Sequence, residues 1–280
     1  MAIQSQHYAV LARRTGADGV TWTSREAAGN YFWLDVVYGG GLFVAVAGSG
    51  TLTRVMTSPD GVNWTIRTNS VDNLWQAVTY GNGLFVAVAR SGTGNRVMTS
   101  PDGITWTIRT SAADTQWYDV VYGGSPGNEL FVAVSYTGYN TLVMTSPDGI
   151  TWTLRTTPAD NGWVSVTYGN GLFVAVAYNG TGVGDGGTGD RVMTSINGIT
   201  WTIQASPADS QWRSITYGNG LFFAVARNGY PNQITTSPDG LTWTLRTAPA
   251  DRFWYSTAYG AGRFVGIANN GPTSQVMTNP

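Results

Sequence analysis

The chain has 280 residues, of which only 11% are charged, and its formal net charge is −1. All 15 basic residues are arginine, and they form no basic footprint of the kind that binds nucleic acid, so no nucleic-acid partner is expected. The lack of cysteine excludes a disulfide framework and thiol chemistry. Apolar runs reach about seven residues, too few to span a bilayer, so membrane insertion is not expected.

A unit of about 40 residues repeats along the chain and is seen most clearly at residues 75–110. Four short runs with alternating polarity predict four strands, at Trp75–Tyr80, Leu84–Ala89, Arg96–Ser100 and Ile104–Thr110. Gly81-Asn82-Gly83 supplies residues with positive φ for a tight hairpin, and Pro101-Asp102-Gly103 supplies a second turn. Four antiparallel strands in this length indicate one blade of a β-propeller.

The 12 tryptophans mark six such units, with two tryptophans in each. The first strands begin at Trp33, Trp75, Trp117, Trp163, Trp212 and Trp254, and the last strands carry Trp22, Trp64, Trp106, Trp152, Trp201 and Trp243. Length differences between units fall within loops, as a repeat architecture requires. A tryptophan at a fixed position beside alternating apolar residues favours a core role over ligand stacking.

The two chain ends complement each other. The sixth unit stops at Pro280 without a fourth strand, whereas the N-terminal region offers a fourth-strand sequence without the first three strands. We therefore predict an all-β, six-bladed propeller of four-stranded antiparallel blades, closed by an N-terminal strand at residues 18–26 that completes the last blade. Residues 1–17, which contain the single histidine His7, form an extension, and residues 18–280 form one domain.

The hairpin Ser58-Pro59-Asp60-Gly61-Val62-Asn63-Trp64 recurs in the other units, with its first serine at Ser100, Ser146, Ser195 and Ser237. It resembles the Asp-box of the BNR-repeat propellers, the superfamily that includes the sialidases. The spacing between Asp and Gly is one residue shorter than in that family, and Asn197 replaces the aspartate in one copy. The resemblance implies a propeller in which the carboxylate stabilises the turn between the third and fourth strands.

Sialidase chemistry, as the resemblance implies it, needs three arginines around the substrate carboxylate, a tyrosine–glutamate pair and an aspartate. The repeated arginines of this chain fall in the outermost strand of each blade, away from a central site, at Arg25, Arg67, Arg109, Arg155 and Arg246. The only glutamates are Glu26 and Glu129, neither of which recurs. A sialidase-type glycosidase is therefore a minor alternative, and we expect no enzyme activity, catalytic residue or cofactor.

The loops differ between the two faces of the predicted ring. The turns after the first and third strands are nearly identical in every unit, whereas the loops between the second and third strands diverge. A binding surface is therefore expected on the divergent face, which also carries the links between blades. The candidate ligand-binding residues are four isolated tyrosines, Tyr136, Tyr139, Tyr178 and Tyr230, and one aspartate per link, Asp72, Asp114, Asp160, Asp209 and Asp251. These aspartates are either Asx-type turn residues or acceptors for sugar hydroxyls.

These features predict a non-enzymatic recognition module that binds glycans at several equivalent sites. The alternative is a structural or adhesive component of a large assembly, such as a phage or viral appendage, whose other subunits would be its partners. Composition favours a location outside the cell or on a virion surface, although the sequence shows no signal peptide. The segment Gly182–Asp190 offers Asp185 and Asp190 as calcium ligands, but a flexible loop is favoured and no metal is expected.

Overall fold

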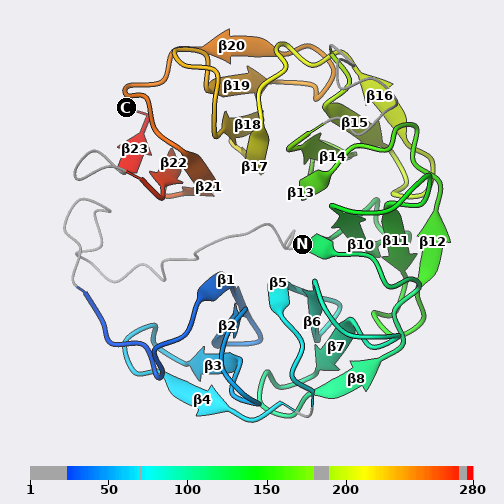
Figure 1. Cartoon of the computed structure of the whole chain (residues 1–280), viewed down its shortest axis with the longest axis vertical. Helices are drawn as coiled ribbons and strands as arrows, with labels where there is room; N and C mark the ends of the chain where they lie inside the picture. The colour runs from blue at the N-terminus through cyan, green and yellow to red at the C-terminus, as the bar shows by residue number, and fades with distance from the viewer. Residues whose placement is uncertain (1–23, 70, 180–188, 271–275, 280) are drawn as a thin grey trace.

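The computed structural model describes residues 24–69, 71–179, 189–270 and 276–279. In this part of the chain the strands form six antiparallel sheets, five with four strands and one with three, and each sheet follows the order of the strands in the sequence. The sheets stand as blades around a common axis (Figure 1). The predicted six-bladed, all-β propeller is therefore confirmed. Among the described residues, no helix has the length and apolar character needed to cross a membrane.

Each blade begins with its innermost strand, and the strands that follow step outward (Figure 1). The innermost strands are β1 (Trp33–Gly39), β5 (Trp75–Gly81), β9 (Trp117–Gly123), β13 (Trp163–Gly169), β17 (Trp212–Gly218) and β21 (Trp254–Gly260). The second strands are β2 (Leu42–Ala47), β6 (Leu84–Ala89), β10 (Leu130–Ser135), β14 (Leu172–Ala177), β18 (Leu221–Ala226) and β22 (Arg263–Ala268). The third strands are β3 (Val55–Ser58), β7 (Val97–Ser100), β11 (Val143–Ser146), β15 (Val192–Ser195), β19 (Ile234–Ser237) and β23 (Val276–Thr278). The fourth strands are β4 (Thr65–Arg67), β8 (Thr107–Arg109), β12 (Thr153–Arg155), β16 (Thr202–Gln204) and β20 (Thr244–Arg246).

The predicted hairpins form as expected, but the fourth strands are shorter than predicted. At the turn between β5 and β6, Asn82 and Gly83 have φ values of 48° and 74°, the left-handed pair that a two-residue hairpin requires. The strand predicted at Ile104–Thr110 is only Thr107–Arg109. Its first residues are held instead in the preceding turn, because Asp102 Oδ1 accepts hydrogen bonds from the backbone N–H groups of Ile104 and Thr105.

The core lies between blades rather than inside them. In one such cluster, Val44 and Val46 of β2 pack with Trp75 and Val78 of β5 and with Trp106, which follows in the same blade as β5. Trp75 is fully buried, as are its counterparts Trp117, Trp163 and Trp212. Second strands are covered on both sides in this way, which explains why they read as almost continuous apolar runs.

Hydrogen bonds between adjacent innermost strands also join the blades. Asp119 Oδ2 of β9 accepts hydrogen bonds from the backbone N–H of Val166 and the hydroxyl of Ser165, both in β13. Ser165 Oγ in turn accepts the N–H of Ile215 in β17. Close packing adds to these bonds: a Cβ added at Gly81 would lie 2.1 Å from Cγ of Tyr122 in the next blade. The ring is therefore built by repeated contacts between each innermost strand and the next.

The predicted closing strand is not seen in the described part of the chain. Residues 18–23 lie outside the described residues, as do His7 and the rest of the extension at residues 1–17. Ser24, Arg25 and Glu26 are exposed and belong to no strand, and β23 pairs with β22 alone. The described ring is open between blade 6 (β21–β23) and blade 1 (β1–β4), as Figure 1 shows. Closure by the N-terminal segment is taken up below as a proposal.

Candidate functional site

Every innermost strand carries a β-bulge at its second residue. In β17, for example, Trp212 pairs with Ala226 and Ser214 pairs with Val225, so that Arg213 is the extra residue. The same shift in register occurs in the other five blades. A bulge changes the direction of its extra side chain, and bulges often lie beside functional sites. The six bulge residues line one cavity at the centre of the ring: Leu34, Gln76, Tyr118, Val164, Arg213 and Tyr255.

The sequence varies at the bulge although its surroundings do not. The tryptophan just before the bulge is the same in all six blades, whereas the bulge residue is leucine, glutamine, valine or arginine once each and tyrosine twice. Because each bulge residue occupies the same place in a nearly identical repeat, the fold does not require these differences. The variation is therefore a sign of specialisation at the centre of the ring.

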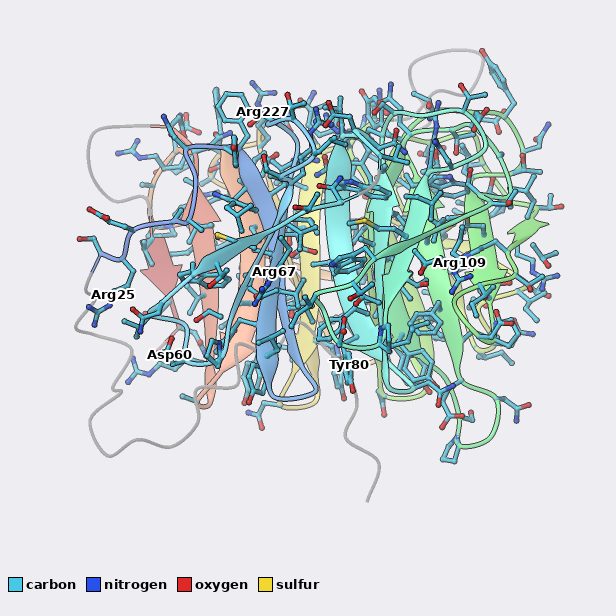
Figure 2. The ribbon with its side chains drawn as sticks, turned by 90° about the horizontal axis from the view of Figure 1, so that it is seen from below. Arg25, Asp60, Arg67, Tyr80, Arg109 and Arg227 are labelled. Carbon is cyan, nitrogen blue, oxygen red and sulfur yellow. The ribbon has the colours of Figure 1, made fainter. Side chains whose placement is uncertain are left out.

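A second set of varied residues surrounds the bulges on the same face. The residue just after each second strand donates its backbone N–H to the carbonyl of the residue just before the tryptophan of the innermost strand, as Arg227 does to Gln211. This bond recurs in all six blades and fixes the backbone of six residues, the opening residues, five of which carry side chains: Gly48, Arg90, Tyr136, Tyr178, Arg227 and Asn269. Arg227 lies on the face opposite to Tyr80 and to the turn of Asp60 (Figure 2).

Together, the bulge residues and four of the opening residues, Tyr136, Tyr178, Arg227 and Asn269, form what we call the axial pocket. Its outer part has a volume of about 300 Å³ and is lined by Tyr118, Tyr136, Tyr178, Arg213, Arg227, Trp254, Tyr255 and Asn269. Its inner part, about 80 Å³, reaches Asp35 and Asp119, whose carboxylates also bond backbone N–H groups of the next blade. The outer part thus offers two cations and four phenols but no acidic side chain.

Arginine and tyrosine side chains are paired within this pocket. Arg213 Nη2 donates to Tyr255 Oη at 2.7 Å, and the guanidinium lies 4.3 Å from the ring centre of Tyr255 and 5.5 Å from that of Tyr118. Arg227 Nη1 donates to Tyr178 Oη at 2.8 Å. Neither arginine forms an ion pair with a residue that the structure describes. Two guanidinium groups are therefore free to meet a negative charge from a ligand.

The phenols form a continuous aromatic surface beside these cations. The ring centres of Tyr118 and Tyr136 are 5.2 Å apart, and those of Tyr136 and Tyr178 are 6.3 Å apart. Because Tyr178 and Tyr255 each accept a bond from a guanidinium, each retains its own hydroxyl proton for donation to a ligand. The pocket can therefore bind an anion, stack against an aromatic or planar group, and donate protons.

The structure separates the four candidate tyrosines into two groups. Tyr136 and Tyr178 line the axial pocket. Tyr139 and Tyr230 are 78% and 52% exposed and line neither part of the axial pocket. Of the candidate tyrosines on the divergent face, two therefore meet at the axis and two lie apart from it.

The link aspartates stabilise loops. Asp72 accepts the backbone N–H of Leu52 and lies 3.3 Å from a guanidinium nitrogen of Arg54. Asp114, Asp160 and Asp209 accept the N–H of the residue 20 positions earlier in the same way, at Gly94, Asn140 and Gly189. For Asp251 that position is Pro231, which has no N–H to donate. Of the two interpretations left open, the structural one is favoured for these four aspartates, although each bond joins two loops 20 residues apart and does not form a local Asx-type turn.

The turns between the third and fourth strands use their aspartates in the same structural manner. In blade 5, Asp239 Oδ1 accepts hydrogen bonds from the backbone N–H groups of Leu241 and Thr242 and from the hydroxyl of Ser237. The bonds from Thr242 and Leu241 lower the pKa of Asp239 to about 2. In blade 4, Asn197 makes the corresponding bonds to Ile199 and Thr200 without a charge. The geometry of this turn therefore does not depend on ionisation.

This contrast predicts the effect of acid. The pKa of Asp239 lies below that of an unfolded aspartate, about 3.9, so its contribution to stability is present above pH ~4 and is lost as the pH falls toward 2. Asp239→Asn should leave the melting temperature at pH 7 nearly unchanged and reduce its fall between pH 5 and pH 2.5. Asn197→Asp should increase that fall. Thermal unfolding followed by circular dichroism tests both, and equal acid sensitivity in all three proteins would contradict this reading.

The arginines of the fourth strands form hydrogen bonds to the neighbouring third strands, at the outer edge of their blades and away from the centre. Nε of Arg67, Arg109, Arg155 and Arg246 donates to a threonine hydroxyl of the third strand, at Thr57, Thr99, Thr145 and Thr236. Figure 2 shows Arg67 and Arg109 far from the opening that Arg227 marks. These arginines therefore do not form a central anion clamp.

Metal binding receives no support from the described residues. In that part of the chain, no group of three or more acidic or histidine side chains is placed to hold a metal ion. Asp190 is described, but Asp185 and the rest of the proposed calcium loop lie outside the described residues.

Comparisons with known proteins identify the fold. No protein-family model and no curated protein matches the chain. Among solved structures, virginiamycin B lyase from Staphylococcus aureus has a TM-score of 0.69 at 12% identity, with coverage of 89% of this chain and 84% of that chain. A streptogramin B lyase has a TM-score of 0.63 at 12% identity, covering 85% and 90%. A computationally designed protein, Ika8, has a TM-score of 0.60 at 15% identity, covering 90% and 71%.

These comparisons correct the functional expectations. The prediction that the chain is not an enzyme is contradicted, since two of the similar structures are lyases on a propeller scaffold. Glycan binding, a phage or viral appendage and a sialidase-type glycosidase find no counterpart among them, and these interpretations are withdrawn. The expectation of several equivalent sites rested on the link aspartates, four of which bond backbone N–H groups of loops, while the bulge residues of all six blades line one axial pocket. At 12% identity the likeness concerns the fold, so the reaction is a matter for proposal.

Proposed function

We propose that this chain is an enzyme that binds a small anionic substrate with a planar or aromatic part in the axial pocket. The observation that carries the proposal is the placement of Arg213 and Arg227, neither of them ion-paired with a described residue, beside four tyrosines in the axial pocket, where the bulge residues of the blades differ. The outer volume of about 300 Å³ is at the small end of the range for small-molecule sites. A charge-assisted bond to each guanidinium would orient the anionic group.

The tyrosines supply the groups for proton transfer in this proposal. Tyr255 and Tyr178 accept bonds from Arg213 and Arg227, which leaves each phenol able to donate its proton to a departing group on the substrate. A lyase breaks a bond by elimination, with loss of a proton and a leaving group and no uptake of water. The likeness in fold to two lyases supports this reaction class. One phenol would protonate the leaving group, and the phenolate so formed, held by its guanidinium, would take up the proton that the substrate loses, so that the enzyme ends the step with the protons it began with.

The proposal also covers the family relation of the chain and its location. The Asp-box resemblance is supported by the turn geometry around Asp60 and its copies, where a serine, the aspartate and the following N–H groups form one hydrogen-bonded unit. We infer a distant relation to those propellers without their sialidase site. A location outside the cell stays a prediction from composition.

Binding is tested with simple probes. In isothermal titration calorimetry, benzoate and phenyl phosphate should bind the wild-type chain at least tenfold more tightly than neutral benzamide. Arg213→Gln combined with Arg227→Gln should weaken benzoate binding tenfold or more, because a bond to a charged group contributes about 1.5–3 kcal/mol. Arg109→Gln removes the same charge at a blade edge and should leave binding unchanged. Equal losses in both variants, or equal binding of benzamide, would contradict the proposal.

Catalysis is tested separately. Virginiamycin B gives its name to the lyase that has a similar fold. It is therefore the first compound to incubate with the chain. Mass spectrometry should show conversion without the added mass of water. Tyr255→Phe should slow turnover tenfold or more while benzoate binding is retained. Loss of binding in Tyr255→Phe would show that the phenol only positions Arg213, and a product heavier by one water would replace elimination with hydrolysis.

A further inference from the structure

Blade 6 differs from the other five in how it is covered. Its sheet has three strands in the described part of the chain, and its outer strand, β23, has one free edge there. Val276 of β23 is 57% exposed, whereas its counterpart Val97 in β7 is fully buried. Val36 of β1, on the other side of the opening, is 50% exposed, whereas its counterpart Val78 is fully buried. Apolar side chains that face a neighbouring blade everywhere else thus face solvent here.

A groove of about 520 Å³ lies on the other side of blade 6, against blade 5 (β17–β20). Its apolar lining comes from Phe223 and Ile234 of blade 5 and from Phe264 and Met277 of blade 6. Ala248 also lines the groove. Each of the four preceding clusters between blades includes the indole of the tryptophan just before a fourth strand. These tryptophans are Trp106, Trp152, Trp201 and Trp243. The cluster between blades 5 and 6 is built from the same strands and includes no such indole from the described residues.

We propose that residues 18–26 of this chain occupy this place as the fourth strand of blade 6, with the indole of Trp22 in the groove. The repeat fixes the register. Third and fourth strands pair threonine with threonine in every complete blade, as Thr99 does with Thr107 and Thr145 with Thr153. Applied to blade 6, this register would place Thr23 opposite Thr278 and Arg25 opposite Val276. It requires Ser24, Arg25 and Glu26 to leave the exposed, strand-free position that the structure gives them and to join the sheet.

The side chains of the segment match the edge that they would cover. Arg25 falls where Arg109 lies in blade 2 (β5–β8), so its Nε would donate to Thr278 as Arg109 Nε donates to Thr99 Oγ1 at 2.9 Å. Trp22 falls where Trp106 lies, whose Nε1 donates to the carbonyl of Gly103 at 3.0 Å. Gly19 is the corresponding glycine in the N-terminal segment. With β23 paired, blade 6 presents a complete sheet to blade 1 and the ring has no open edge.

A disulfide between strands tests the register directly, because the chain has no cysteine of its own. Thr23→Cys combined with Thr278→Cys places two thiols directly opposite each other, where Cβ atoms in paired strands are about 4.5–5.5 Å apart. The matched control is Arg25→Cys with Thr278→Cys, a diagonal pair about 7–8 Å apart. Mild oxidation should cross-link most of the first variant within one chain and little of the control, as read from non-reducing gels and peptide mass spectrometry.

The other outcomes are decisive as well. A cross-link between two chains would show that the segment completes a second copy, and equal cross-linking in both pairs would show a mobile segment without register. Either result overturns the proposal. If the double variants do not fold, hydrogen exchange of the wild-type chain answers the same question. The amides of Val276–Thr278 should then be protected at least tenfold more in the full chain than after removal of residues 1–26, and equal protection would overturn it.

Discussion

Removal of residues 1–26 is expected to destabilise the chain strongly, with either a lower melting temperature or a loss of cooperative unfolding. The truncation leaves the edge of β23 unpaired and the groove against Phe223 and Met277 open to solvent. Burial of one indole contributes about 4–6 kcal/mol before entropy is subtracted. Scanning calorimetry should show a melting temperature lower by about 10 °C or more, or a broad transition with aggregation.

Removal of residues 1–15 is the matched control for that truncation. This shorter deletion retains the whole fourth-strand sequence, so the melting temperature should stay within about 2 °C of the full chain. If both truncated chains melt like the full chain, the N-terminal segment does not complete the last blade. If both are equally destabilised, the extension itself contributes to the fold.

Trp163→Ala is expected to lower the free energy of unfolding by about 3–5 kcal/mol. The indole is fully buried between blades 3 (β9–β12) and 4 (β13–β16), where it packs with Val132, Val134 and Val143. Its loss leaves a cavity that the flat, rigid sheets cannot close, and it also removes contacts on two blades at once. Urea unfolding followed by circular dichroism measures the change.

Tyr139→Ala is the control for that substitution, because Tyr139 is an aromatic residue that is 78% exposed. It should change the free energy of unfolding by less than about 0.5 kcal/mol. A loss of less than about 1 kcal/mol in Trp163→Ala would show that the interface between blades adapts to the cavity, and that the tryptophans do not determine the stability of the ring.

The repeat made most of the fold predictable from sequence. Hairpin turns such as Asn82-Gly83 and the paired tryptophans recur at fixed positions, so each copy tests the assignment made in the others. The fourth strands were predicted too long because Asp102 and its counterparts draw the first residues of those strands into the turn. Local hydrogen bonds of aspartate compete with the sheet in a way that the apolar pattern does not show.

The candidate site was only partly predictable. Divergent loops pointed to the face that carries the axial pocket and to Tyr136 and Tyr178, but Arg213 and Tyr255 lie inside strands that looked like ordinary core. The missed signal was the residue after each first-strand tryptophan, which differs between blades while its neighbours do not. The side chain of this residue lines the pocket at a β-bulge. A bulge is a feature of the pairing register between two strands, which the sequence of one strand does not show. Four of the link aspartates, which the sequence left open as turn residues or ligand acceptors, bond loop backbone, because a position repeated in most units serves the fold more often than a ligand.

The location of an anion in the ring tests the central claim most directly. A crystal soaked in sodium bromide reports anion sites by anomalous scattering, without knowledge of the substrate. Our account predicts the strongest bromide peak in the axial pocket, within contact distance of the guanidinium groups of Arg213 and Arg227. Strong peaks at blade-edge arginines such as Arg67 and Arg109, with none in the axial pocket, would contradict the assignment of that pocket as the functional site.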